Sequence, residues 1–258
     1  MKHIMLYFLY FITIFAIIPK STQHNGEIAL TFDDGPTYYT REILDYLENE
    51  DIQVTFHFTT QNIVRPEMRS LIMRAAEEGH TIGLRLDPSR NYDGQDKSYI
   101  SSDIKKQLSV LGGAIGKKIK FVRANMPSGI VDPVVEQVAL ENDLILTRPS
   151  HSFYNDKDTL ENARDNIELF FKIASYNDDS FIILLHDEME EYFPILETIV
   201  KHARNEKFNF VNLDKGMKGY IPGQDGLTRS NKGSKLTNHA SIEILNIIPL
   251  CLMILIFV

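Results

Sequence analysis

Seven short apolar segments, each followed by a helix-like segment, constrain the fold of this chain more than any other feature of its sequence. The segments are rich in β-branched and aromatic residues and are bounded by polar residues or glycine, as buried strands usually are. They are Ile28–Asp33, Val54–Phe58, Thr81–Leu84, Ile119–Arg123, Leu144–Thr147, Phe181–His186 and Asn209–Leu213. About seven β–α pairs in succession predict an α/β fold with a parallel sheet inside and helices outside. Periodicity alone leaves a closed barrel and an open, doubly wound sheet as alternatives.

The helix-like segments repeat apolar residues at spacings of three and four. The repeats run through 43–47, 71–76, 100–115, 134–139, 160–174 and 195–203. Gly79 is expected to follow the end of the second helix, and Ser101 or Ser102 to cap the start of the third. No glycine-rich phosphate loop opens any of these segments, which argues against nucleotide binding. In either architecture, the chemistry is expected at the carboxyl ends of the strands.

Two of the predicted strands end in side chains that can carry chemistry. The string Thr31–Pro36 places Asp33 and Asp34 directly after a buried strand, where desolvation and like charge both oppose ionisation. Such a pair usually serves a metal ion, an arginine partner or proton transfer, although an exposed Asp-Gly turn is the alternative. Another strand ends in His186 and Asp187. A histidine held by a carboxylate can act as a general acid or base, and a loop histidine without a catalytic role is the alternative.

Four strings, in chain order, resemble the motifs of the polysaccharide deacetylase family, which includes chitin and peptidoglycan deacetylases. They are Ile28–Pro36, Thr55-Phe56, Gly79-His80-Thr81-Ile82-Gly83 and Leu184-Leu185-His186-Asp187. The resemblance covers about Ile28 to Leu213. It implies a distorted (β/α) barrel of the TIM type, a divalent metal that is usually zinc, and hydrolysis of N-acetyl groups from amino-sugar polymers.

The resemblance also implies roles for individual residues. Asp33 matches the catalytic base of the family, His186 its catalytic acid, and Asp34 its metal-binding aspartate. The family completes the metal site with two histidines after the glycine-histidine string, and this sequence has Arg85 and Ser89 at those positions. Neither side chain is a usual zinc ligand. Asp34 is therefore expected to be the lone remnant of the metal site, and no bound metal is expected.

Two later motifs of the family are altered. Arg123 matches the arginine of an expected Arg-x-Pro-x-Gly string, but the spacing of the following residues differs. The Asp-x-x-Asp-Trp motif has no clear match, and the sequence contains no tryptophan. Candidates to rebuild a metal site are His57, His151 and Asp87. His80 is expected to face away from Arg85, because side chains alternate along an extended segment.

Arg85 argues against a rebuilt metal site. Its guanidinium keeps a permanent positive charge, and it can pair with a carboxylate through two parallel hydrogen bonds. We hypothesise that Arg85 replaces the charge of the metal by neutralising Asp34 or Asp33. An Arg85 side chain that points into solvent is the alternative.

The two ends of the chain differ from its middle. The apolar run Ile4–Ile18 is shorter than the roughly 20 residues of a membrane span and predicts a signal peptide over residues 1–22. An uncleaved anchor is the alternative. The deacetylase-like domain is expected over residues 23–222. Residues 223–258 combine a polar spacer with the apolar tail Ile247–Val258, which predicts a GPI-anchor signal, with a short tail anchor as the alternative.

These features predict a protein that is secreted to the cell surface or wall and held at the membrane by a lipid. The formal charge of −8 argues against a nucleic-acid partner. The leading reading is a deacetylase relative with little or no activity that binds chitin-like N-acetylglucosamine polymers. One alternative is an active metal-dependent chitin deacetylase with rearranged ligands. The other is a purely structural surface protein.

Overall fold

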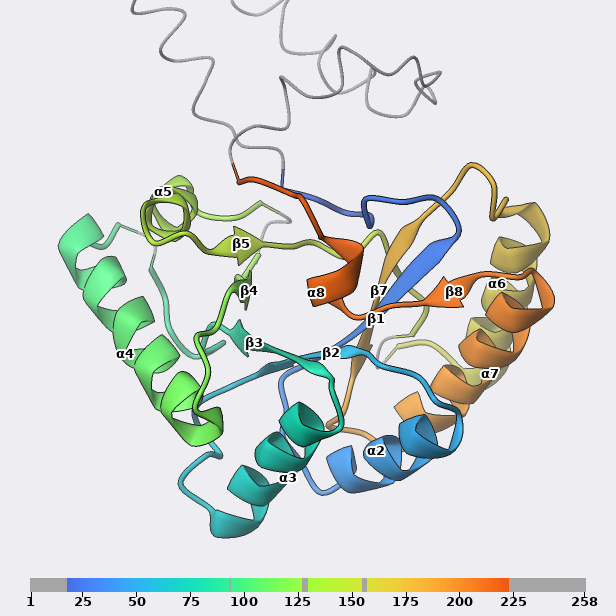
Figure 1. The fold of residues 1–258 in the computed structure, drawn as a ribbon, viewed down its shortest axis with the longest axis horizontal. Helices are drawn as coiled ribbons and strands as arrows, with labels where there is room; N and C mark the ends of the chain where they lie inside the picture. The colour runs from blue at the N-terminus through green and yellow to red at the C-terminus, as the bar shows by residue number, and fades with distance from the viewer. Residues whose placement is uncertain (1–17, 93, 127–129, 155–156, 223–258) are drawn as a thin grey trace, which may run out of the picture. The chain divides into compact units, whose positions relative to one another are not determined.

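The strands form one parallel sheet that curls into a half-barrel, with the helices around its outside (Figure 1). The computed structural model describes residues 18–222, apart from 93, 127–129 and 155–156. The strands are β1 (Glu27–Asp33), β2 (Thr55–Phe58), β3 (Thr81–Arg85), β4 (Phe121–Arg123), β5 (Ile145–Leu146), β6 (His151–Ser152), β7 (Phe181–His186) and β8 (Asn209–Phe210). Their order is β5-β4-β3-β2-β1-β7-β6, and β8 pairs with the start of β1. The sequence prediction of a distorted barrel with about seven parallel strands is confirmed.

Six of the described helices lie where the apolar spacing predicts them, whereas a short last helix was not predicted and begins at Leu213, the end of a segment predicted as a strand. The helices are α2 (Thr40–Asn49), α3 (Pro66–Glu77), α4 (Lys97–Ile115), α5 (Pro133–Glu141), α6 (Leu160–Ile173), α7 (Tyr192–Asn205) and the short α8 (Leu213–Gly216). Gly79 follows α3 with a φ of +86°, which only glycine adopts without strain. The predicted cap of α4 at Ser101 or Ser102 is wrong. This helix begins a turn earlier, after Asp96. The sequence prediction missed the first turn because it shows no apolar periodicity.

β1 lies at the centre of the sheet, between β2 and β7 (Figure 1). Ile28, Ala29, Leu30 and Phe32 of this strand are at most 1% exposed. Both faces of a parallel sheet are covered, so its strands are apolar along their whole length. Asp33, the last residue of β1, and Asp34, which follows it, are therefore held at the middle of the sheet by a buried strand.

β6 was not predicted from the sequence. It pairs His151 with Ile183 and Ser152 with Leu184 of β7. A strand of two residues is too short to show an alternation of apolar and polar residues, so β6 can be recognised only from its pairing with β7.

Residues 18–22, which the sequence places in a leader peptide, contact this domain. The carbonyl of Pro19 accepts a hydrogen bond from the backbone N–H of Arg148 at 3.0 Å, and that of Thr22 accepts one from Ser180 Oγ at 3.2 Å. The rest of the predicted leader and the predicted spacer and tail lie outside the described residues. Across residues 18–222, as far as they are described, no helix is both long and apolar enough to cross a membrane.

Candidate functional site

The register of the parallel strands places a row of polar side chains at the carboxyl end of the sheet. Asp33 of β1 is level with His57 of β2 and with His186 of β7. His57 is in turn level with Gly83 of β3. Side chains at level positions of neighbouring strands point to the same face of the sheet. The two strand-end groups predicted from the sequence, Asp33 and His186, therefore meet at one end of the half-barrel.

Asp33 is closed in by positively charged and polar groups. Its Oδ2 atom lies 3.5 Å from Arg123 Nε and 3.9 Å from Arg85 Nε. Its Oδ1 atom lies 3.0 Å from His57 Nδ1. Burial acts to raise the pKa of Asp33, but Arg123 and His57 outweigh burial and hold this pKa well below its usual range. The carboxylate is therefore ionised, paired and only 4% exposed.

Asp34 forms the ion pair that the sequence hypothesis assigns to Arg85. The Arg85 Nε atom donates to Asp34 Oδ1 at 2.9 Å. Asp34 has a φ of +73°, in the left-handed region. This conformation allows the carboxylates of two successive residues to face the same guanidinium, which an extended strand would not permit. The alternative, an Arg85 side chain in solvent, is wrong, since the side chain is only 15% exposed.

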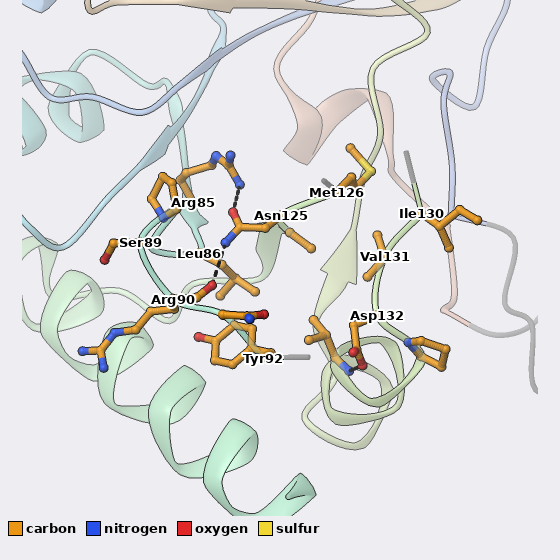
Figure 2. Close-up of a pocket in the computed structure, with 15 residues that line it drawn as sticks. Arg85, Leu86, Ser89, Arg90, Tyr92, Asn125, Met126, Ile130, Val131 and Asp132 are labelled. Atoms are coloured by element: carbon orange, nitrogen blue, oxygen red, sulfur yellow. Dashed lines mark hydrogen bonds between the residues drawn. The ribbon is translucent and has the colours of Figure 1, made fainter. Parts of the chain in front are cut away.

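Asn125, which the sequence did not single out, holds the other end of the Arg85 guanidinium. Arg85 Nη1 donates to Asn125 Oδ1 at 2.6 Å and to the carbonyl of Arg123 at 3.4 Å. The amide of Asn125 donates to the carbonyls of Asp87 and Arg90, at 3.0 and 3.4 Å. Figure 2 shows Asn125 between Arg85 and the loop after β3. The guanidinium is therefore fixed at both ends.

His186 is held by a phenol and not by its neighbour Asp187. The Nδ1 atom of His186 lies 2.9 Å from Tyr192 Oη, and its Nε2 atom lies 3.4 Å from Asp34 Oδ2. The expectation that Asp187 holds His186 is wrong, because successive side chains of a strand alternate between faces. Asp187 is buried beneath the turn after β1, where it accepts a hydrogen bond from Thr40 Oγ1.

The remaining sequence candidates lie away from the ion pair. Ser89 donates to Asp87 Oδ1 at 2.6 Å, and Gln61 donates to the same oxygen at 2.6 Å. Both oxygens of Asp87 are engaged, since Arg90 Nε lies 3.4 Å from Oδ2. His80 accepts a hydrogen bond from the backbone N–H of Val54, on the side of β3 away from Arg85, as the alternation predicts. The ring of His151 packs against the aromatic rings of Phe153, Phe170 and Phe181.

The donor set of this site does not fit the zinc ion that the family implies. Within the described part of the chain, no group of three or more His, Cys, Asp or Glu side chains is placed to hold a metal ion. Asp33 and Asp34 face Arg85 and Arg123, so the four charges already sum to zero. A divalent cation placed here would leave two uncompensated positive charges next to fixed guanidinium groups. The charge of Arg85 thus opposes the cation directly.

A pocket of about 850 Å³ opens beside Arg85, between the loops that follow β3 and β4 (Figure 2). Its wall is mainly apolar, and Arg85 and Asn125 contribute polar atoms to it. The apolar residues are Leu86, Pro88, Tyr92, Ala124, Met126, Ile130, Val131, Pro133 and Val135. Ligand sites commonly combine such a wall with a few fixed polar groups. This hollow is therefore where the site can receive a ligand.

The half-barrel, with its polar row at the carboxyl ends of the strands, defines an α/β-barrel protein of the kind that binds its ligand at that end. Residues 20–145 match the sequence model of the polysaccharide deacetylase family. A bifunctional xylanase/deacetylase of Pseudobutyrivibrio xylanivorans is 28% identical over 206 residues. The match covers 78% of this chain but 32% of the length of that relative.

Solved structures show the same fold. The chitin deacetylase of Colletotrichum lindemuthianum superposes with a TM-score of 0.70 at 19% identity, over 79% of this chain and 94% of the other. A CE4 family pseudoenzyme from Bacillus anthracis superposes with a TM-score of 0.64 at 15% identity, over 77% and 67% of the two chains. Residues 20–145 thus form part of a polysaccharide deacetylase domain, and the resemblance seen in the motifs is confirmed.

Proposed function

We propose that this protein is a polysaccharide deacetylase relative that binds an N-acetylglucosamine polymer without hydrolysing its acetamido groups. One observation carries the proposal: Arg85 Nε lies 2.9 Å from an oxygen of Asp34, the residue that the family resemblance assigns to the metal. A guanidinium cannot lose its proton in a protein and so cannot become a ligand.

The magnitudes support the loss of hydrolysis. Zinc lowers the pKa of bound water from about 15.7 to about 7, which is worth roughly eight orders of magnitude in available hydroxide. A positioned general base contributes only about 10²–10⁴. Asp33 and His186, our predicted base and acid, cannot replace the metal. A fixed arginine can stabilise a negative oxygen, but it does not generate the nucleophile.

Two further observations support retained binding. The pocket beside Arg85 has a volume of about 850 Å³, which leaves room for a ligand next to the altered metal position. The fold is shared with a chitin deacetylase and with a pseudoenzyme of the same family. Chitin and related wall polymers are therefore the proposed ligands.

The decisive experiment compares metal content, hydrolysis and binding in the purified protein. We expect no stoichiometric zinc after incubation with the metal, no acetate release from chitooligosaccharides, and retention on insoluble chitin. Stoichiometric zinc together with rapid acetate release would establish an active deacetylase with rearranged ligands instead. Failure to bind chitin or any other wall polymer would favour a purely structural surface protein.

A matched pair of variants sharpens this experiment. The double substitution Arg85→His and Ser89→His restores the two histidines of the family pattern and removes the opposing charge. We expect this variant to bind zinc, whereas Arg90→His, which adds an imidazole to the same loop but leaves the Arg85–Asp34 pair intact, should not. A mutant of a CE4 family pseudoenzyme has restored enzymatic activity, which supports the use of substitutions for this purpose.

We also propose that the protein is displayed at the cell surface through a lipid anchor. The support is the apolar run Ile4–Ile18 and the polar spacer followed by the apolar tail Ile247–Val258. Treatment of intact cells with a phosphatidylinositol-specific phospholipase should release the protein. Protein that stays on the cells after this treatment, or that remains inside them, would contradict the proposed anchor.

A further inference from the structure

His57 is a buried histidine to which the proposed function assigns no role. It is the third residue of β2, and its relative exposure is 0%. Neither ring nitrogen has a hydrogen-bond partner of good geometry in the described part of the chain. A buried polar group without a partner costs free energy, so its presence in the centre of a sheet calls for an explanation.

The position of the ring is set by the sheet. His57 is level with Asp33 on one side and with Gly83 on the other. A Cβ atom at Gly83 would lie 2.5 Å from His57 Cδ2, so the ring occupies the space that a side chain at position 83 would fill. The imidazole of His57 on β2 therefore packs where Gly83 on β3 has no side chain. This arrangement directs the other edge of the ring toward Asp33.

The Nδ1 atom of His57 lies 3.0 Å from Asp33 Oδ1, which is a hydrogen-bond distance in a bent geometry. Burial lowers the pKa of His57, although Asp33 acts in the opposite direction. A neutral imidazole carries one proton. Next to a carboxylate, that proton is most favourable on Nδ1, where it can be donated to Asp33.

We propose that His57 is a positioning residue that, together with Arg123, holds the Asp33 carboxylate inside the half-barrel and away from the pocket. This inference rests on the proposed function, because it concerns the same site. His57 occupies Oδ1 and Arg123 faces Oδ2. The Asp33 side chain is left 4% exposed. A general base must come within about 2.6–3.2 Å of the proton that it takes.

The consequence is that two separate features of the site oppose hydrolysis. The first is the Arg85–Asp34 ion pair, which opposes the metal. The second is the withdrawal of Asp33 by His57, which comes from a different strand and does not involve the positions of the lost ligands. Restoring the ligands would therefore leave the candidate base withdrawn.

The first test is the protonation of the His57 ring in the full-length protein, labelled with ¹⁵N at histidine. The His57 signals are identified by their loss in the His57→Phe variant. We expect the imidazole spectrum at neutral pH to show a proton on Nδ1. A spectrum in which Nδ1 carries no proton would overturn the proposal, because the ring could not then donate to Asp33.

The second test is the reactivity of the Asp33 carboxyl toward a water-soluble carbodiimide and an amine, measured by peptide mass spectrometry. We expect severalfold more modification of Asp33 in His57→Phe than in the unsubstituted protein. His151→Phe replaces a half-buried histidine among aromatic rings outside the site and should leave Asp33 as protected as before. Equal modification in His57→Phe and the unsubstituted protein would overturn the proposal.

Circular dichroism establishes whether each variant is folded. If the phenylalanine ring is not accommodated next to Gly83, His57→Leu removes both ring nitrogens with a different shape and gives the same expectation. Stoichiometric zinc in the unsubstituted protein would refute the proposed function but would not change these two readouts. A protected Asp33 in the leucine variant would refute the role of His57 and leave the proposed function standing.

Discussion

At the scale of a single residue, the guanidinium of Arg85 supplies the positive charge that a metal ion would supply in this site. Its hydrogen bonds explain why the side chain keeps this position. Asp34 accepts from Nε at 2.9 Å, and Asn125 accepts from Nη1 at 2.6 Å. Hydrogen bonds to a charged group are about twice as strong as those between neutral groups. A long side chain that is fixed at both ends loses most of its conformational freedom, and these bonds offset that entropy cost.

Asn125→Ala removes the acceptor of Arg85 Nη1 and the donor to two loop carbonyls. We expect the free energy of unfolding to fall by about 1–3 kcal/mol, because partly buried charged and carbonyl groups lose their partners. Urea denaturation measures the change. Asn25→Ala removes one exposed bond, to the carbonyl of Asn177 at 2.7 Å, and should stay within about 0.5 kcal/mol. Equal effects of the two substitutions would contradict the anchoring role of Asn125.

Asp187 gives a residue-scale prediction for pH. Burial raises the pKa of Asp187 to about 7, against hydrogen bonds that lower it. The folded protein therefore holds this proton more tightly than the unfolded chain, in which the carboxyl has a pKa of about 3.9. The stabilisation of the folded state by the protonated Asp187 carboxyl is fully present below about pH 4 and is lost as the pH rises through 7.

The matched variant is Asp187→Asn, whose amide remains neutral at every pH. We expect the two proteins to differ little near pH 4, and the variant to gain on the unsubstituted protein by up to about 4 kcal/mol by pH 8. Urea denaturation at several pH values measures this difference in the free energy of unfolding. The titration of the other carboxylates cancels, because both proteins contain them. A difference that does not change with pH would show that Asp187 ionises normally in the folded protein.

At the scale of elements, the contact between β2 and β3 determines which side chain fits in the centre of the site. Gly83 belongs to the glycine-histidine string that carries the family resemblance, and it leaves the room that the His57 ring fills. The carbonyl of Phe121 on β4 closes the same space from the other side, at 3.1 Å from a Cβ built on Gly83. Three neighbouring strands therefore meet around a position without a side chain.

Gly83→Ala would force the new methyl group against His57 and Phe121. We expect a loss of about 1–3 kcal/mol in the free energy of unfolding, as for other overpacked cores. Gly113→Ala is the control, since Gly113 lies in α4 with open space around it and alanine is the better helix former. That variant should gain about 0.5–1 kcal/mol. A neutral effect of Gly83→Ala would mean that His57 moves easily.

At the scale of the whole molecule, the charges of the site balance without a metal, so folding should not depend on one. A ligand that binds only the folded state adds stability according to its concentration, about 2.7 kcal/mol at 100 times its dissociation constant. We expect the thermal midpoint of the unsubstituted protein to be the same in zinc and in a chelator. A rise of several degrees in zinc would contradict the balance of charges described here.

The sequence by itself predicted most of the strands and helices and placed Asp33, Asp34 and His186 at strand ends, because buried apolar strands and amphipathic helices leave a periodic record. Periodicity left the choice between a barrel and an open sheet unresolved, and the distorted barrel followed from the family resemblance of the motifs. It also predicted that Arg85 pairs with Asp34 or Asp33, from one substitution compared with the family pattern, and the structure selects Asp34 at hydrogen-bond distance. Only the tertiary structure decided that Tyr192 and not Asp187 holds His186, that Asn125 fixes Arg85, and that His57 reaches Asp33. These contacts join residues of different strands and loops, and the register and strand order that bring them together leave no trace in local spacing.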